Sequence, residues 1–122
     1  MILIDTSVWI DHLHNGIPRL AEALESQEVL SHPFVIGELA CGEMKMRREF
    51  LGLLSDLPAG MVATHEEALD FIERHRLMGK GIGYTDVHLL ASVMLTERAQ
   101  IWTRDKRLAA IAAGLRIGFE SD

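Results

Sequence analysis

ILIDTSVWI, at residues 2–10, is the stretch of sequence that decides the fold. Its first three residues are apolar and two of them are β-branched, which is typical of a short buried strand. Asp5 ends this apolar run, and either Thr6 or Ser7 can cap a helix formed by the residues that follow. A buried strand that leads directly into a helix is typical of an α/β fold.

The rest of the chain repeats this alternation. Further strands are expected at residues 29–30, 101–102 and 117–119. Helices are expected to begin at Pro18, at Pro33 and after the capping box of Thr64 and Glu67. Further helices are expected through Phe50 to Leu54, from Tyr84 to about Arg98, and from a cap at Asp105 to Gly114. We therefore predict one domain over residues 1–122, an α/β/α sandwich with a short, mostly parallel central sheet.

Composition narrows the class of protein. The chain has 122 residues, of which 48% are hydrophobic and 25% charged, so it has enough apolar material for one packed core and is not a disordered chain. A single cysteine excludes an intramolecular disulfide, and no apolar run reaches the about 18 residues of a membrane span. Because the start also lacks the pattern of a signal peptide, we expect a soluble, cytoplasmic protein. The net charge of −6 is unlike that of a general nucleic-acid coating protein.

Four carboxylates lie against apolar segments rather than on polar faces. Asp5 and Asp105 each follow a predicted strand, and in open α/β sheets ligands bind at that end of the strands. Asp86 shares a helical face with apolar residues three, four and seven positions further on. Glu38 lies on a helical stripe with Phe34 that is predicted to face inward. A carboxylate in such a place is costly unless it is paired, hydrogen-bonded or bound to a metal.

Each acid also has an ordinary structural explanation. Asp5 and Asp105 can cap helices, Asp86 can stabilise a helix N-terminus, and Glu38 can pair with an arginine. If all four converge, however, two of their charges about 4 Å apart repel by about 4 kcal/mol at an effective dielectric of about 20. A divalent cation relieves this repulsion, and ligands that are all oxygen favour Mg²⁺ or Mn²⁺. The six histidines have no zinc-binding spacing and are predicted to be surface or partly buried residues.

Four stretches of the chain resemble the PIN-domain ribonucleases, in the order and at the spacing of that family: residues 2–10, 37–39, 83–91 and 102–108. Within the family, the chain is similar to the VapC toxins of type II toxin–antitoxin systems. Leu108 departs from the pattern, because the family often has an aromatic residue there. The resemblance implies a PIN-like fold and endonucleolytic cleavage of RNA, with tRNA or rRNA as the expected substrate and Mg²⁺ or Mn²⁺ as the cofactor.

The resemblance also implies roles for particular residues. Catalytic and metal-binding roles fall on the acids that match the family's four, Asp5, Glu38, Asp86 and Asp105. Hydroxyl residues that match supporting positions are Thr6 or Ser7, beside the first acid, and Thr103, two residues before the last. Cations beside the last acid could contact RNA phosphates: Arg104, Lys106 and Arg107.

Partners follow from the same resemblance. It implies an RNA substrate, a cognate VapB-type antitoxin that covers the acidic site, and a homodimer, with no membrane association. A non-catalytic module that binds RNA or protein on the same scaffold is the alternative. The retention of all four acids argues against it.

Overall fold

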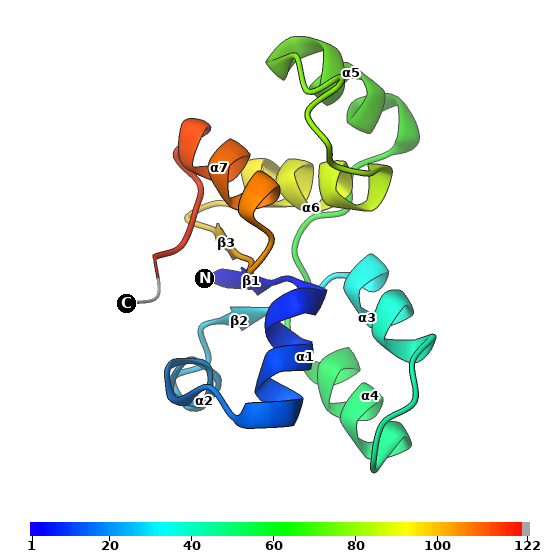
Figure 1. Cartoon of the computed structure of the whole chain (residues 1–122), viewed down its shortest axis with the longest axis vertical. Helices are drawn as coiled ribbons and strands as arrows, with labels where there is room; N and C mark the ends of the chain where they lie inside the picture. Colours follow the sequence, from blue (N-terminus) through cyan, green and yellow to red (C-terminus); the bar gives the residue numbers. More distant parts are fainter. Residues whose placement is uncertain (121–122) are drawn as a thin grey trace.

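The computed structural model describes residues 1–120. A three-stranded parallel sheet lies at the centre of the molecule (Figure 1). Its strands are β1 (Ile2–Ile4), β2 (Val29–Leu30) and β3 (Gln100–Trp102), in the order β2-β1-β3. Because both neighbours run parallel to β1, the carboxyl ends of all three strands meet at one edge of the sheet.

Helices surround this short sheet. They are α1 (Thr6–Asn15), α2 (Pro18–Glu25), α3 (Pro33–Ala40), α4 (Arg47–Asp56), α5 (His65–His75), α6 (Tyr84–Leu95) and α7 (Lys106–Gly114). In the view of Figure 1, α1 and α2 lie below the sheet and α6 and α7 above it, while α3 and α4 form a separate pair. The predicted α/β/α class is thereby confirmed. No helix within residues 1–120 is long and apolar enough to span a membrane.

Local signals place most helix starts correctly. Pro18 and Pro33 are the first residues of α2 and α3, where the missing amide N–H of proline costs no hydrogen bond. At the start of α5, the Glu67 amide donates to the Thr64 hydroxyl at 3.1 Å, and the Thr64 amide donates to the Glu67 carboxylate at 2.8 Å. This reciprocal pair is the capping box that the sequence predicts.

The first helix begins one residue earlier than the predicted caps allow. Thr6 and Ser7 are already helical, and Asp5 is the N-cap, its side chain accepting a hydrogen bond from the Thr6 amide at 2.8 Å. The prediction that Thr6 or Ser7 caps α1 is therefore wrong. Asp5 takes that position because an extended residue at the end of β1 already has the backbone conformation of a cap.

Two predicted boundaries also differ from the structure. Helix α6 ends at Leu95 rather than near residue 98, since Thr96 turns extended and its hydroxyl donates back to the Ser92 carbonyl at 2.7 Å. The predicted strand at 117–119 is a single parallel bridge between Gly118 and Ile101. The 115–119 segment reaches the edge of β3 directly from the end of α7, and it pairs there for one residue only.

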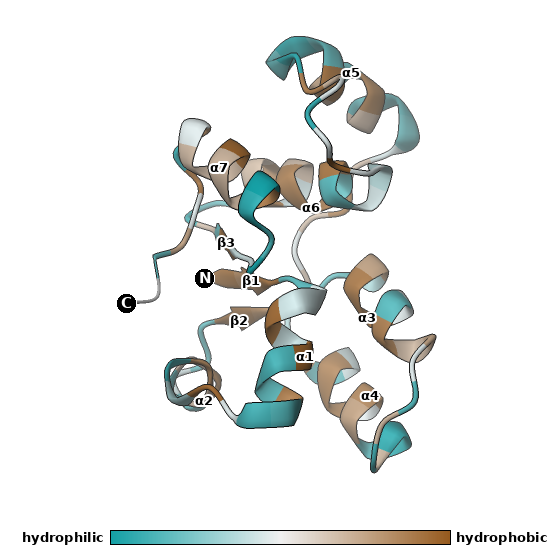
Figure 2. Ribbon diagram, viewed as in Figure 1, coloured by the Kyte–Doolittle hydropathy of each residue, from teal (hydrophilic) through white to brown (hydrophobic). Residues whose placement is uncertain are grey.

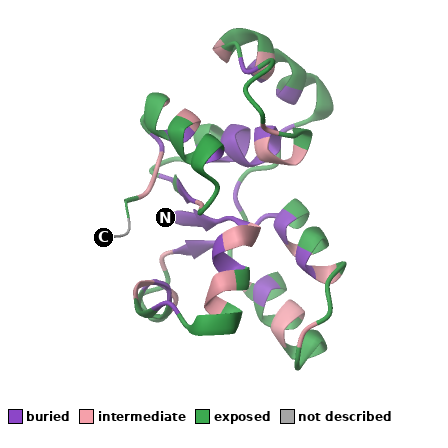
Figure 3. Ribbon diagram, viewed as in Figure 1, coloured by how far each residue is buried: buried purple, intermediate pink, exposed green. Residues whose placement is uncertain are grey.

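The core joins the strands to the inner faces of the helices. All three residues of β1 are buried, as is nearly the whole middle of α6, and Figures 2 and 3 show this apolar, buried material at the centre. Trp9 on α1 and Trp102 on β3 are each 2% exposed. The Trp9 ring packs edge-on against Phe50 of α4, with ring centroids 5.6 Å apart. Trp9 is therefore part of the core.

Two histidines are core residues, contrary to the prediction that all six are surface or partly buried. His32 is fully buried, and its Nδ1 atom accepts the Phe34 amide N–H at 3.0 Å, so the imidazole is the N-cap of α3. His88 on α6 is also buried, and its ring lies 4.7 Å from that of Phe34. His32 replaces the usual Asp or Ser cap at a site where an aromatic ring can pack as well.

The buried His32 makes the fold sensitive to acid. Burial, and then the proximity of His88, lower the pKa of His32 to about 4, against 6.5 in an unfolded chain. The unfolded state therefore binds more protons between these values, and the His32 contribution to stability is complete above about pH 6.5 and lost as the pH falls towards 4. Replacing His32 by Asn keeps a capping acceptor. In this variant the urea midpoint of unfolding should fall less steeply between neutral pH and pH about 5 than in the wild type. His14→Asn on the exposed end of α1 is the control, and equal slopes for the two variants would contradict the assignment.

Candidate active site

Asp5 lies in a fixed network of hydrogen bonds at the end of β1. Its side chain is buried, and Oδ2 accepts hydrogen bonds from the Ser7 hydroxyl at 2.9 Å and the Thr103 hydroxyl at 2.6 Å. Oδ1 accepts the Thr6 amide N–H at 2.8 Å. Of the three predicted supporting residues, Ser7 and Thr103 therefore contact Asp5 through their side chains, and Thr6 does so through its main chain.

Strand register explains why residues so distant in sequence meet here. Ile4 of β1 is paired with Trp102 of β3, and the Asp5 amide donates to the Trp102 carbonyl at 3.0 Å. The next residues on the two strands, Asp5 and Thr103, are therefore side by side. The Arg104 amide donates to Ser7 Oγ at 3.0 Å, which extends the same network.

Asp105 is joined to this network through Thr103. The Asp105 amide donates to Thr103 Oγ1 at 3.0 Å, and Asp105 Oδ1 caps α7 by accepting from the amides of Arg107 and Leu108 at 2.9 and 3.0 Å. Within residues 1–120, Oδ2 of Asp105 has no hydrogen-bond partner and its side chain is exposed. The ordinary explanation, a helix cap, thus holds for Asp5 and Asp105, and one oxygen of Asp105 remains free for another ligand.

Asp86 is the acid on whose charge the other three act. It lies in the first turn of α6, half-buried, where Oδ2 accepts the Gly83 amide N–H at 3.4 Å. Its pKa is raised mainly by burial, against the lowering effect of the Gly83 hydrogen bond, and further by the charges of Asp5, Asp105 and Glu38. All three other predicted acids are therefore close enough to Asp86 to act on its charge.

Glu38 lies on an exposed face of α3. Val35 and Leu39 are the residues of α3 that face the core, whereas Glu38 and Phe34 are exposed. The prediction that Glu38 lies on an inward stripe is therefore wrong. α3 packs on α1 and α4 through the neighbouring helical face, which turns Glu38 outward, into the lining of a hollow beside α1.

The donor set fits a hard divalent cation held in an open site. All four side chains offer oxygen. Asp86 is destabilised as an anion first by burial and then by the charges of the other three acids, and a cation would relieve that repulsion. Residues 1–120 contain no three His, Cys, Asp or Glu side chains grouped tightly enough to enclose an ion. In the described part of the chain, the four acids therefore match a hard cation in the type of their ligand atoms and do not form a closed cluster.

The cations that follow β3 have different surroundings. Arg104 forms an ion pair with Asp11 of α1 at 3.3 Å and lies 5.9 Å from the centre of the Trp102 ring. Lys106 is exposed on the first turn of α7. Arg107 lies against Gly81, where a side-chain carbon would come within 2.8 Å of its Cδ and Nη1 atoms. Arg104 is therefore partly neutralised, whereas Arg107 forms no ion pair within residues 1–120.

Comparison with known proteins gives the family of this fold and site. The sequence pattern of the PIN domain matches residues 2–114. The chain belongs to the PIN-domain family. It is 50% identical over 113 residues to Ribonuclease VapC32 of Mycobacterium tuberculosis, in strain CDC 1551 / Oshkosh and in strain H37Rv, and this likeness covers 93% of the chain and 91% of that relative. The PIN domain extends from β1 into the end of α7 and includes all four acids.

Two features around this PIN site were missed from the sequence. One is the burial of His32, although a residue directly before a helix-starting proline is the expected N-cap. The other is the contact of Arg107 with Gly81, whose φ of 81° is in the region that favours glycine. The three alternating glycines before α6 signal a special backbone, but sequence alone does not name the side chain that covers it.

Proposed function

We propose that this PIN-domain protein is an endoribonuclease toxin of the VapC type that cleaves RNA with Mg²⁺ or Mn²⁺ bound by Asp5, Glu38, Asp86 and Asp105. The choice of site rests chiefly on the hydrogen-bond network that joins Asp5 to Thr103 and Asp105, and the raised pKa of Asp86, caused by burial and by the charges of the other three acids, supports it. The 50% identity to Ribonuclease VapC32 gives the reaction and the class of substrate. In keeping with that class, tRNA or rRNA is the expected target.

Hydrolysis of a phosphodiester needs an activated water and neutralisation of charge on the phosphate. A bound divalent cation supplies both. Asp5 is the most rigid of the proposed ligands because two hydroxyls and one amide hold its two oxygens. Asp86 holds a proton more readily than an ordinary carboxyl group, so protons compete with the cation at its carboxylate as the pH falls.

Glu38 and Asp105 have less constrained positions. Oδ2 of Asp105 is free while Oδ1 holds the helix, so this carboxylate can orient a water or a second cation from a fixed anchor. Glu38 is exposed on α3, whereas the other three acids lie on other elements. The mechanism therefore assigns Asp5 and Asp86 to the centre of the site and the other two acids to its rim.

Toxin activity implies control by a partner. We propose that a cognate VapB-type antitoxin binds over the acidic site in the cytoplasm, with a basic side chain placed among the carboxylates. A net charge of −6 favours such an encounter. A homodimer is the proposed assembly.

Hydrolysis by water would leave 5′-phosphate and 3′-hydroxyl ends, because the 2′-hydroxyl does not attack the phosphate. We expect the downstream RNA fragments to ligate directly to an adaptor that requires a 5′-phosphate, and EDTA to stop the cleavage. The measurement is sequencing of ligated 5′ ends, with and without prior kinase treatment. Ligation that depends on the kinase would contradict this mechanism.

A further inference from the structure

A hollow of about 480 Å³ lies between α7, the end of α5 and the segment that joins α5 to α6. Its polar lining consists of cationic or titratable basic side chains, Lys80, Arg107 and His75. The rest of the lining is apolar or glycine, with Leu77, Ile111 and Leu115 as its larger side chains. A basic rim around an apolar floor is the chemistry that accommodates a nucleotide, since the rim suits phosphate and the floor suits a base.

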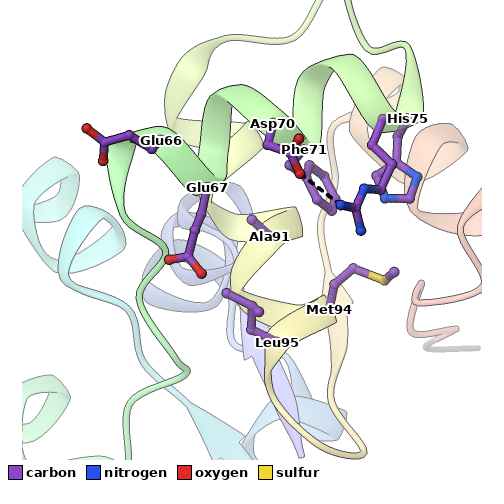
Figure 4. A pocket seen from close by; sticks show the side chains of 9 residues that line it. Glu66, Glu67, Asp70, Phe71, His75, Ala91, Met94 and Leu95 are labelled. Carbon is purple, nitrogen blue, oxygen red and sulfur yellow. Dashed lines mark hydrogen bonds and ion pairs between the residues drawn. The ribbon is translucent and has the colours of Figure 1, made fainter.

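Three other hollows in residues 1–120 have a different charge. The one between α5 and α6 is lined by Glu66, Glu67 and Asp70, and Figure 4 shows these acids beside apolar side chains of α6. The hollow beside α1 contains two glutamates and Lys45, and the one beside β3 contains Glu120 and Arg116. The α7 hollow has no carboxylate in its lining. On a chain of net charge −6, it is the hollow of these four that attracts a polyanion.

The side chain of Arg107 lies against the backbone of Gly81. Gly81 has a φ of 81°, and a Cβ atom there would lie 2.8 Å from both Cδ and Nη1 of Arg107. The arginine side chain therefore lies flat on a residue that has no side chain, and it forms no ion pair within residues 1–120. An unpaired guanidinium group at this place is suited to bind a phosphate through two nitrogen donors.

Two short segments of the chain connect the hollow to the acidic site. Arg107 lies two residues after Asp105, whose Oδ1 accepts the Arg107 amide N–H at 2.9 Å. Lys80 lies three residues before Gly83, which is the N-cap of α6 and donates to Asp86. If one phosphate of an RNA strand lies at the acids, a neighbouring phosphate of the same strand can therefore contact Arg107 and Lys80.

We infer that the hollow formed by Lys80, Arg107 and His75 binds a nucleotide of single-stranded RNA next to the cleaved phosphate. Arg107 and Lys80 contact the phosphate, and the base covers the apolar floor beside His75, whose ring already packs on Phe71 with centroids 4.5 Å apart. This inference rests on the proposed ribonuclease function and gives that function a second contact area for its substrate.

Arg107→Ala and Lys80→Ala test the inference, with Arg48→Ala as the matched control. Arg48 is the second residue of α4, as Arg107 is of α7, and it is equally exposed. Binding of a fluorescently labelled oligouridine is measured on the Asp5→Asn background at several salt concentrations. We expect each test variant to weaken binding about 5-fold or more and to reduce the salt slope by about 0.7, the contribution of one phosphate contact on a single strand. Arg48→Ala should change neither quantity.

A second readout is cleavage of total bacterial RNA on the wild-type background. We expect Arg107→Ala and Lys80→Ala to raise KM and leave kcat nearly unchanged, because they remove binding that ground state and transition state share. If the wild type cleaves RNA and both variants bind and cleave like Arg48→Ala, the inference is wrong while the proposed function stands. Binding to a polyglutamate peptide is measured as well. If Arg107→Ala and Lys80→Ala lose binding to this peptide but bind RNA like the wild type, the inference is also wrong and the hollow binds an acidic protein instead. Absence of cleavage by the wild type would instead overturn the proposed function.

Discussion

Asp5→Asn is expected to reduce RNA cleavage by at least about 100-fold, since loss of a group that only orients a metal ligand already costs about 10- to 100-fold. The substitution removes the charge of the most firmly held carboxylate and keeps its shape. Its retained oxygen can still accept the Thr6 amide N–H and cap α1, and the amide group can donate to the Ser7 or Thr103 hydroxyl. Rates of cleavage on a labelled RNA, together with circular dichroism, give the measurement.

The control for this experiment is Asp70→Asn. Asp70 makes an exposed ion pair with Arg74 at 3.1 Å within α5. Asp70→Asn therefore removes one negative charge, as Asp5→Asn does, at a place where an ion pair contributes little to stability. Full activity in the control and loss of activity in Asp5→Asn would support the assignment. Substantial cleavage by Asp5→Asn would assign catalysis to other residues, and the same loss in both variants would indicate a general effect of charge.

Asp86→Asn should lower activity by a similar factor and also weaken the stabilising effect of the metal. Because burial and the charges of Asp5, Asp105 and Glu38 raise the pKa of Asp86, its ionised form destabilises the fold at neutral pH. This penalty disappears as the pH falls and the carboxyl group gains its proton. In EDTA, the variant should therefore melt a few degrees above the wild type, with its amide oxygen still able to accept the Gly83 amide N–H.

Thermal melting with and without millimolar Mg²⁺ or Mn²⁺ measures this second effect. The wild type should gain stability from the cation, since the cation binds the folded state and neutralises the carboxylates. Asp86→Asn should gain much less. If the wild-type Tm changes with neither cation, or if the variant melts below the wild type in EDTA, the electrostatic description of the site is wrong.

Much of the fold was predictable because its signals are local. A proline at the start of a helix and the Thr64–Glu67 capping box act within one turn, so the sequence carries them directly. The meeting of Asp5 with Thr103 was predictable for a related reason. Parallel strands end at the same edge, and the residues that follow them must meet there.

The features that sequence did not predict depend on packing between elements. Glu38 faces outward because α3 turns Val35 and Leu39 to the core, and the spacing of apolar residues alone allowed either face. His32 is buried because a cap and an aromatic contact coincide at one position. The 117–119 segment forms only a bridge, since its approach from α7 sets how far it runs beside β3. Such outcomes depend on tertiary geometry, which overrides local preference.

The central claim, a divalent cation among Asp5, Glu38, Asp86 and Asp105, is tested most directly by a crystal soaked in Mn²⁺. Anomalous scattering locates the ion without assumptions about its ligands. The account predicts a peak at the carboxyl end of β1 within reach of Asp5 and Asp86, and its disappearance in a crystal of Asp5→Asn. A peak elsewhere, or RNA cleavage by the same preparation at full rate in EDTA with no peak at these acids, would contradict it.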